Sequence, residues 1–149
     1  MPIKVINGPR RNAVPHLVQC DACRRSFSIR GIRMQEKKER EFQAQFFACP
    51  MCVKKYLVSC TDESQRKRIE QRKRKLVQIR TGIERHFRVK TMSRYRSELE
   101  WLDAEIRKRG AELNQIGKRW IDGERLEVIL TEQSEEKIDQ VQEADNGAE

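Results

Sequence analysis

Apolar and polar residues alternate along the first third of the chain with the period of two that predicts β-strands. The alternation runs through residues 27–29, 42–46 and 56–58. Between the first two of these stretches, the polar segment QEKKERE, residues 35–41, is typical of a hairpin tip. The pattern therefore predicts a small antiparallel sheet.

From Asp62 onward the apolar residues recur every seven positions, which predicts helices. One series holds Ile69, Leu76 and Ile83, and a second holds Met92, Leu99, Ile106, Leu113 and Trp120. Nine residues separate Ile83 from Met92, so the two series are out of phase. We therefore expect an antiparallel two-helix coiled-coil hairpin over residues 62–121, with its turn near residues 87–91.

The apolar seam and the charges of this hairpin agree on one alignment. A turn centred near Val89 sets the seam residues of one helix against those of the other, as Leu76–Leu102, Ile79–Leu99 and Ile83–Tyr95. The same alignment predicts the ion pairs Arg68–Glu112 and Lys75–Glu105. Trp101 falls on an outward position. It either covers the sheet, forms a dimer contact or anchors a partner protein.

Charge divides the chain into three parts. Residues 1–60 carry a net charge of +8, residues 61–121 a net +9, and residues 122–149 a net −8. We expect corresponding modules at residues 1–61, 62–121 and 122–149, the last an acidic, partly disordered tail. Such a tail either keeps the protein soluble, competes with nucleic acid for the basic modules or offers an acidic motif to a partner protein.

Composition limits how the N-terminal module can fold. The 149 residues are 37% charged and 6% aromatic, so apolar burial alone supplies little stability. No apolar run reaches the roughly 18 residues of a membrane span, and the N-terminus lacks the apolar stretch of a signal peptide. We therefore expect a cytoplasmic protein with no membrane contact, whose five cysteines bind metal or stay as free thiols.

Four of the cysteines are spaced as metal ligands. They are Cys20, Cys23, Cys49 and Cys52, two CxxC pairs separated by 25 residues. Two such pairs brought together offer four thiolates in a tetrahedron, the arrangement that Zn²⁺ favours. A closed shell of four sulfurs leaves no position for water, so we expect one structural zinc ion. An iron ion takes the same four ligands and is the alternative to zinc. The fifth cysteine, Cys60, is interpreted as a structural thiol.

A β-hairpin with a CxxC loop at each base resembles a zinc ribbon, and the resemblance covers residues 16–60. The segment Cys49-Pro50-Met51-Cys52 matches the CPxC form of that family, whereas Arg24 and Val53 stand where ribbons often carry glycine. The expected fold is thus α+β, a zinc ribbon followed by the helical hairpin. This layout, with the opening MPIKVINGPR…VPHLVQCDACRRSF, is also similar to small zinc-ribbon proteins encoded by bacteriophages.

No phosphate-binding glycine loop, GxSxG or HExxH motif is present, so we expect no enzymatic activity. The first functional hypothesis is a zinc-binding regulator that contacts nucleic acid or a nucleic-acid-processing complex through the ribbon. The six basic residues expected to make this contact are Arg24, Arg25, Arg30, Arg33, Lys54 and Lys55. The basic run at residues 65–80 is assigned instead mostly to the hairpin. The alternative hypothesis is an adaptor or inhibitor of a host protein, acting through the hairpin and the acidic tail. We also expect a host or phage protein as a partner, and the hairpin could form a homodimer.

Overall fold

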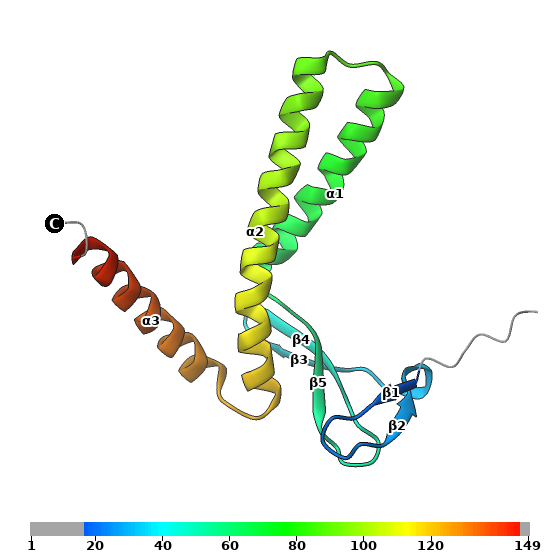
Figure 1. Ribbon diagram of the computed structural model, residues 1–149, viewed down its shortest axis with the longest axis vertical. Helices are drawn as coiled ribbons and strands as arrows, with labels where there is room; N and C mark the ends of the chain where they lie inside the picture. The colour runs from blue at the N-terminus through cyan, green and yellow to red at the C-terminus, as the bar shows by residue number, and fades with distance from the viewer. Residues whose placement is uncertain (1–16, 147–149) are drawn as a thin grey trace, which may run out of the picture.

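The computed structural model describes residues 17–146, so the predicted N-terminal extension lies outside the described residues. The described chain runs through five strands, a 3-10 turn (Ile29–Gly31) and three helices (Figure 1). β1 (Leu17–Gln19) pairs antiparallel with β2 (Ser26–Ser28). β3 (Gln35–Glu39), β4 (Phe42–Ala48) and β5 (Lys55–Thr61) form a second antiparallel sheet in that order. The fold is α+β, as predicted.

The segment predicted to be a hairpin tip is mostly strand. Residues 35–39 form the edge strand β3, and the turn is confined to Arg40 and Glu41, with Arg40 in the left-handed region at φ 53°. An edge strand tolerates charged side chains because its outer side faces solvent. The sequence pattern missed β3 because its central inward residue is a lysine, Lys37, whose ammonium lies 5.0 Å from the centre of the Trp120 ring.

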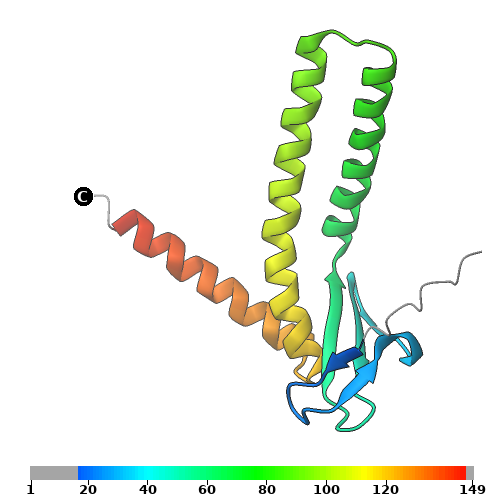
Figure 2. The same ribbon diagram turned by 45° about the vertical axis from the view of Figure 1, so that its right-hand side comes forward.

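Helices α1 (Glu63–Glu84) and α2 (Val89–Ile121) lie antiparallel and side by side, as two views of the molecule agree (Figures 1 and 2). Their turn spans residues 85–88, earlier than the predicted 87–91. His86 takes the left-handed conformation, at φ 52°. The N–H groups of His86 and Phe87 bond to the carbonyls of Ile83 and Gly82, which is the Schellman pattern that usually ends on glycine.

The earlier turn shifts the alignment of the two helices by one heptad of α2, so the predicted ion pairs are wrong. Arg68 lies 3.6 Å from Glu105, and Lys75 pairs with Glu98. Leu76 and Ile83, predicted in the seam, are 39% and 58% exposed. Gly82 takes the inward position instead, where a Cβ would lie 2.4 Å from the Met92 sulfur.

The C-terminal end of α2 leaves α1 behind and packs on the three-stranded sheet. The close approach occurs at Gly117, where a Cβ would lie 2.7 Å from Cβ of Cys60 and 2.8 Å from Cδ2 of Leu57. The resulting core contains residues from β4, β5, α2 and α3: Phe42, Ala44, Phe46, Cys60, Leu113, Ile116, Trp120, Ile121, Leu126 and Ile129. This core therefore continues across both module boundaries expected at residues 61 and 121.

Helix α3 (Leu126–Asn146) occupies most of the segment that was predicted to be a partly disordered tail. Its first turns are anchored because Leu126 and Ile129 are fully buried in the core just described. Arg119 of α2 adds ion pairs to Glu124 and Glu132, at 2.5 and 2.7 Å. The C-terminal end of α3 diverges from the rest of the molecule (Figures 1 and 2).

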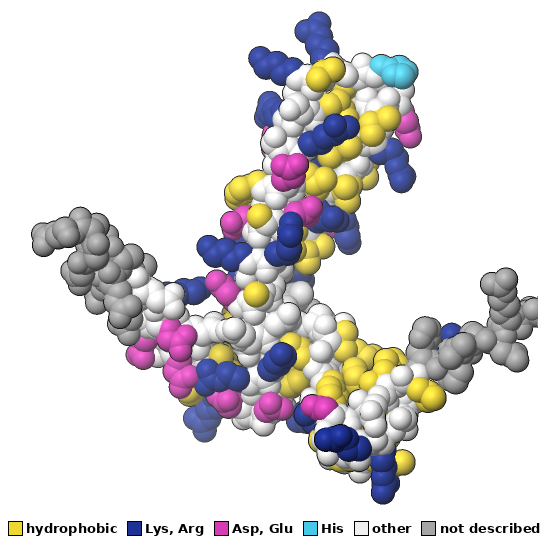
Figure 3. All heavy atoms as spheres, viewed as in Figure 1, with side chains coloured by type: hydrophobic (Ala, Val, Ile, Leu, Met, Phe, Trp, Pro, Cys, Tyr) yellow, Lys and Arg dark blue, Asp and Glu magenta, His cyan; other side chains and the backbone are white. Residues whose placement is uncertain are grey.

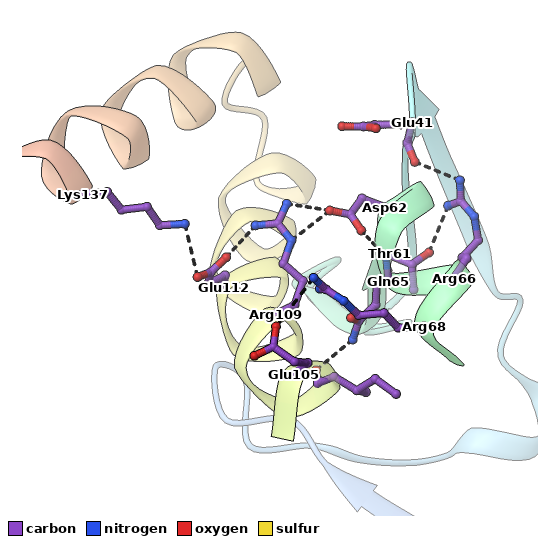
Figure 4. Close-up of polar contacts among 11 residues, drawn as sticks. Glu41, Thr61, Asp62, Gln65, Arg66, Arg68, Glu105, Arg109, Glu112 and Lys137 are labelled. Atoms are coloured by element: carbon purple, nitrogen blue, oxygen red, sulfur yellow. Dashed lines mark hydrogen bonds and ion pairs between the residues drawn. The ribbon is translucent and has the colours of Figure 1, made fainter. Parts of the chain in front are cut away.

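A polar cluster joins the sheet to the helical hairpin (Figure 4). Asp62 directly follows β5 and caps α1 by accepting a hydrogen bond from the Gln65 N–H at 2.7 Å. Its second carboxylate oxygen accepts two hydrogen bonds from Arg109 of α2, at 2.6 and 2.9 Å. Arg109 also pairs with Glu112, which reaches Lys137 of α3. These contacts tie β5, α1, α2 and α3 together at one junction.

Candidate metal centre

The two CxxC segments form loops with the same backbone hydrogen bonds. Behind the first pair, the Arg24 N–H donates to the Cys20 carbonyl at 2.9 Å, and the Cys20 N–H donates to Arg25. Behind the second pair, the Val53 N–H donates to the Cys49 carbonyl at 3.0 Å, and the Cys49 N–H donates to Lys54. The matching geometry turns both pairs of thiols towards the same point.

Each loop turns through a residue in the left-handed region, Arg24 at φ 61° and Val53 at φ 63°. These are the two positions where zinc ribbons often carry glycine. Glycine avoids the steric cost of this conformation, which for other residues is about 1–2 kcal/mol. Val53, being β-branched, is the less favourable of the two. The loops thus keep their geometry at a cost in strain.

The structure brings the four predicted thiols together, with all four sulfur atoms within 4.8 Å of one another. The sulfurs of Cys20 and Cys52 are 3.5 Å apart, and those of Cys23 and Cys49 are 3.8 Å apart. A tetrahedral ion with metal–sulfur bonds of about 2.3 Å requires sulfur–sulfur separations of about 3.8 Å. The donor set therefore fits one such ion with no open coordination position.

The surroundings lower the pKa of two of the four thiols. The N–H of Cys23, aided by the Tyr56 hydroxyl, lowers the pKa of Cys20 to about 6. The N–H of Cys52 lowers the pKa of Cys49. The N–H of Lys54 acts in the same direction on Cys52, but burial and the adjacent thiols outweigh it and raise the pKa of Cys52 to about 11. Four thiolates at this spacing require a cation to offset their repulsion.

A small apolar cluster surrounds the centre and is separate from the larger core. Cys20, Cys49 and Phe27 are buried in it, and the Phe47 ring lies edge-on to Phe27 and stacks on Tyr56. The Tyr56 hydroxyl lies 3.0 Å from the Cys20 sulfur and donates a hydrogen bond to Asp21. Asp21 also pairs with Lys54 at 2.6 Å. Sequence analysis missed Asp21 and Tyr56, whose only signal is proximity to the cysteines.

Two of the six predicted nucleic-acid contacts have structural partners. Lys54 pairs with Asp21, and Lys55 donates to the carbonyl of Ile121 at 3.0 Å. Lys37 similarly donates to the carbonyl of Trp120 at 2.8 Å, so these two lysines satisfy carbonyls at the C-terminus of α2. The four arginines of the prediction, Arg24, Arg25, Arg30 and Arg33, are exposed. Within residues 17–146 they form no ion pair, although Arg25 contacts the Met51 sulfur.

Trp101 lies far along α2 from the metal centre and is 59% exposed. It borders a surface hollow of about 340 Å³ together with Gln71, Arg74, Lys75, Gln78, Glu98 and Leu102. It therefore does not cover the sheet, which was one of the roles expected for it.

Cys60 is buried in the larger core, and this burial raises its pKa to about 11.

Comparison with known proteins finds no matching family model, curated protein or solved structure. Among the described helices, none combines the length and the apolar composition that spanning a bilayer requires.

Proposed function

We propose that the protein is a non-enzymatic regulator in which one structural Zn²⁺, bound by Cys20, Cys23, Cys49 and Cys52, organises a zinc ribbon that contacts nucleic acid or a nucleic-acid-processing complex. The observation that carries the proposal is the gathering of four thiol sulfurs within 4.8 Å by two matching loops. A closed four-sulfur shell supports a structural ion rather than a catalytic one. Reduced thiols further favour a cytoplasmic location.

The ribbon's exposed arginines supply the contact surface. Arg24 and Arg25 directly follow the first pair of cysteines, and Arg30 and Arg33 lie on and just after the 3-10 turn. Arginine suits phosphate because its planar guanidinium offers paired hydrogen bonds and keeps its charge. Lys54 and Lys55 contribute less in this proposal, because Asp21 and the Ile121 carbonyl already engage them. The similarity to phage-encoded ribbon proteins favours a regulatory role in phage biology.

The test is a titration of the zinc-loaded protein with duplex and single-stranded DNA over a range of salt concentrations. We expect log K to fall steeply with log salt for the wild type. The double variant Arg24→Glu/Arg25→Glu should lose most of the affinity. The matched variant Lys73→Glu/Lys108→Glu, which reverses two exposed charges on the hairpin, should lose much less. Undetectable binding at about 50 mM salt would contradict the proposal, because low salt strengthens phosphate contacts.

The exposed Trp101 supports a second candidate function, an adaptor or inhibitor that binds a host or phage protein through the hairpin. A large aromatic side chain at the edge of a hollow is a common anchor in protein interfaces. The same surface could hold a second copy of the chain. Sedimentation of the wild type and of Trp101→Ala tests the homodimer directly, since only a Trp101-dependent dimer would dissociate in the variant.

A further inference from the structure

Ion pairs are unevenly distributed along the helical hairpin. In α1 up to residue 75, most basic side chains have acidic partners: Lys67–Glu63, Arg68–Glu105, Arg72–Asp103, Arg74–Glu70 and Lys75–Glu98. Residues 80–97, around the turn, contain six basic residues and one acidic residue, a net charge of +5. Of the six, only Arg94 has an ion pair within the described part of the chain, with Glu98.

The other five form a set that we call the tip cluster: Arg80, Arg85, Arg88, Lys90 and Arg96. All five side chains are exposed, and none is in an ion pair with another described residue. They come from the end of α1, the turn and the start of α2. Lys and Arg side chains accordingly project from the free end of the hairpin (Figure 3). The cluster is therefore a concentrated positive surface remote from the metal centre.

The turn that carries the cluster is held by backbone hydrogen bonds and by close side-chain packing. Two backbone hydrogen bonds close it, from His86 to Ile83 and from Phe87 to Gly82. Gly82 allows Met92 and Phe87 to approach so closely that a Cβ at this position would lie 2.4 and 3.2 Å from them. Met92 is buried as a result. A rigid support lowers the entropy lost when the charged surface binds a partner.

We propose that the tip cluster is a second contact surface, which binds the phosphate backbone of duplex nucleic acid. The proposal rests on the proposed function, because it takes nucleic acid as the partner, and it adds a second contact. Four of the five residues are arginines, the side chain best suited to phosphate. The cations also extend along the flanks of the hairpin, from Arg80 to Arg96. A planar membrane surface would engage only its end, whereas phosphates lining a groove can engage the flanks as well.

The separation of the two surfaces sets the length of nucleic acid needed to bridge them. α2 begins at the tip and ends at Ile121, whose carbonyl Lys55 contacts next to the second cysteine loop. Its 33 residues span about 50 Å at about 1.5 Å per residue. At about 3.4 Å per base pair, this corresponds to about 15 base pairs. Longer duplexes can engage both surfaces of one molecule, and duplexes well below this length only one.

The test measures fluorescence anisotropy of the zinc-loaded full chain with labelled duplexes of about 10 and about 30 base pairs, lengths on either side of the bridging distance. The tip variant is Arg85→Gln/Arg88→Gln/Lys90→Gln, and the ribbon variant is Arg24→Gln/Arg25→Gln/Arg30→Gln. The control Lys73→Gln/Lys108→Gln/Arg125→Gln removes three exposed charges elsewhere. All substitutions are at exposed positions, and circular dichroism checks that each variant is folded.

On the long duplex, the tip variant should make the negative slope of log K against log salt shallower by about 2.7, since each of three lost phosphate contacts contributes about 0.9. It should also abolish the preference of the wild type for the long duplex, while the control retains that preference. A tip variant that behaves like the control would overturn the proposal. So would binding of the tip to phosphatidylserine vesicles without binding to duplex. A loss confined to the tip variant, with the ribbon variant unchanged, would keep this inference and refute the ribbon's role.

Discussion

The close packing of α2 on β5 predicts opposite effects of the same substitution at two positions of one helix. Gly110 and Gly117 both lie inside α2. A Cβ at Gly110 would meet only the Gln65 amide nitrogen, at 3.6 Å, an ordinary contact. A Cβ at Gly117 would lie 2.7 Å from Cβ of Cys60 and 2.8 Å from Leu57, closer than packed carbon atoms can approach.

Both changes to alanine gain helix propensity, worth about 1 kcal/mol in the free energy of unfolding. Gly110→Ala should therefore be stabilised by up to about that amount. Gly117→Ala gains the same propensity but must push the helix away from the sheet, an overpacking cost of about 1–3 kcal/mol. Because propensity is common to both, the difference between the two variants measures the overpacking cost alone.

The assay is urea unfolding followed by far-UV circular dichroism, at one fixed concentration of free zinc because bound metal adds to the apparent stability. Equal m-values in the two variants would show that they unfold from comparably compact states. We expect Gly117→Ala to be less stable than Gly110→Ala by about 1–3 kcal/mol. Equal stability of the two variants would refute the inference that Gly117 is required for α2 to reach the sheet.

Two further predictions concern the strained loop and the buried cap. Val53→Gly should stabilise the metal-loaded protein by about 1 kcal/mol, because glycine accepts the left-handed conformation without strain. Thermal unfolding measures this change, and unchanged or lower stability would contradict strain at Val53. Burial opposes ionisation of Asp62, but the Gln65 N–H and the Arg109 guanidinium outweigh it and hold the pKa below its usual range. The stability that Asp62 contributes should therefore be present above about pH 4 and be lost as the pH falls through its depressed pKa. Asp62→Asn should remove this part of the acid dependence, and an identical pH profile would disprove it.

The cluster of four cysteines could be predicted from the sequence because its chemistry is local. A CxxC pair brings two thiols together through its own loop, and only the meeting of the two pairs needs the sheet. The inward face of α2 was predictable for a similar reason, since Met92, Leu102, Leu113 and Trp120 follow a helical period and are buried. Neither inference depended on knowing distant contacts.

The exact position of the turn and the strand β3 could not be predicted because their residues contradict local preference. The break between the two heptad series indicated a turn, but His86 occupies a position that usually carries glycine, so no residue type marked where α1 ends. Lys37 stands at an inward strand position because of Trp120, 83 residues later. The Lys37 ammonium lies over the Trp120 ring and donates a hydrogen bond to the Trp120 carbonyl. The roles of Lys54 and Lys55 likewise depended on tertiary partners, Asp21 and Ile121.

The two apolar clusters differ in their dependence on metal. The cluster around Cys20, Phe27 and Cys49 contains three of the four cysteines of the candidate metal centre when Cys23 at its border is included. The larger core contains none of the four and is built on β4, β5, α2 and α3. Removal of the metal should therefore unfold β1, β2 and the two cysteine loops, while the larger core persists.

The central claim is that one metal ion on four thiolates organises the ribbon. Native mass spectrometry of protein purified under reducing conditions, combined with hydrogen exchange before and after chelation, tests it most directly. The account predicts one zinc ion per chain, its loss in Cys49→Ser, and faster exchange after chelation in β1, β2 and the cysteine loops, with Ala44 and Ile116 still protected. A metal-free chain whose cysteine loops exchange as slowly as before would contradict it.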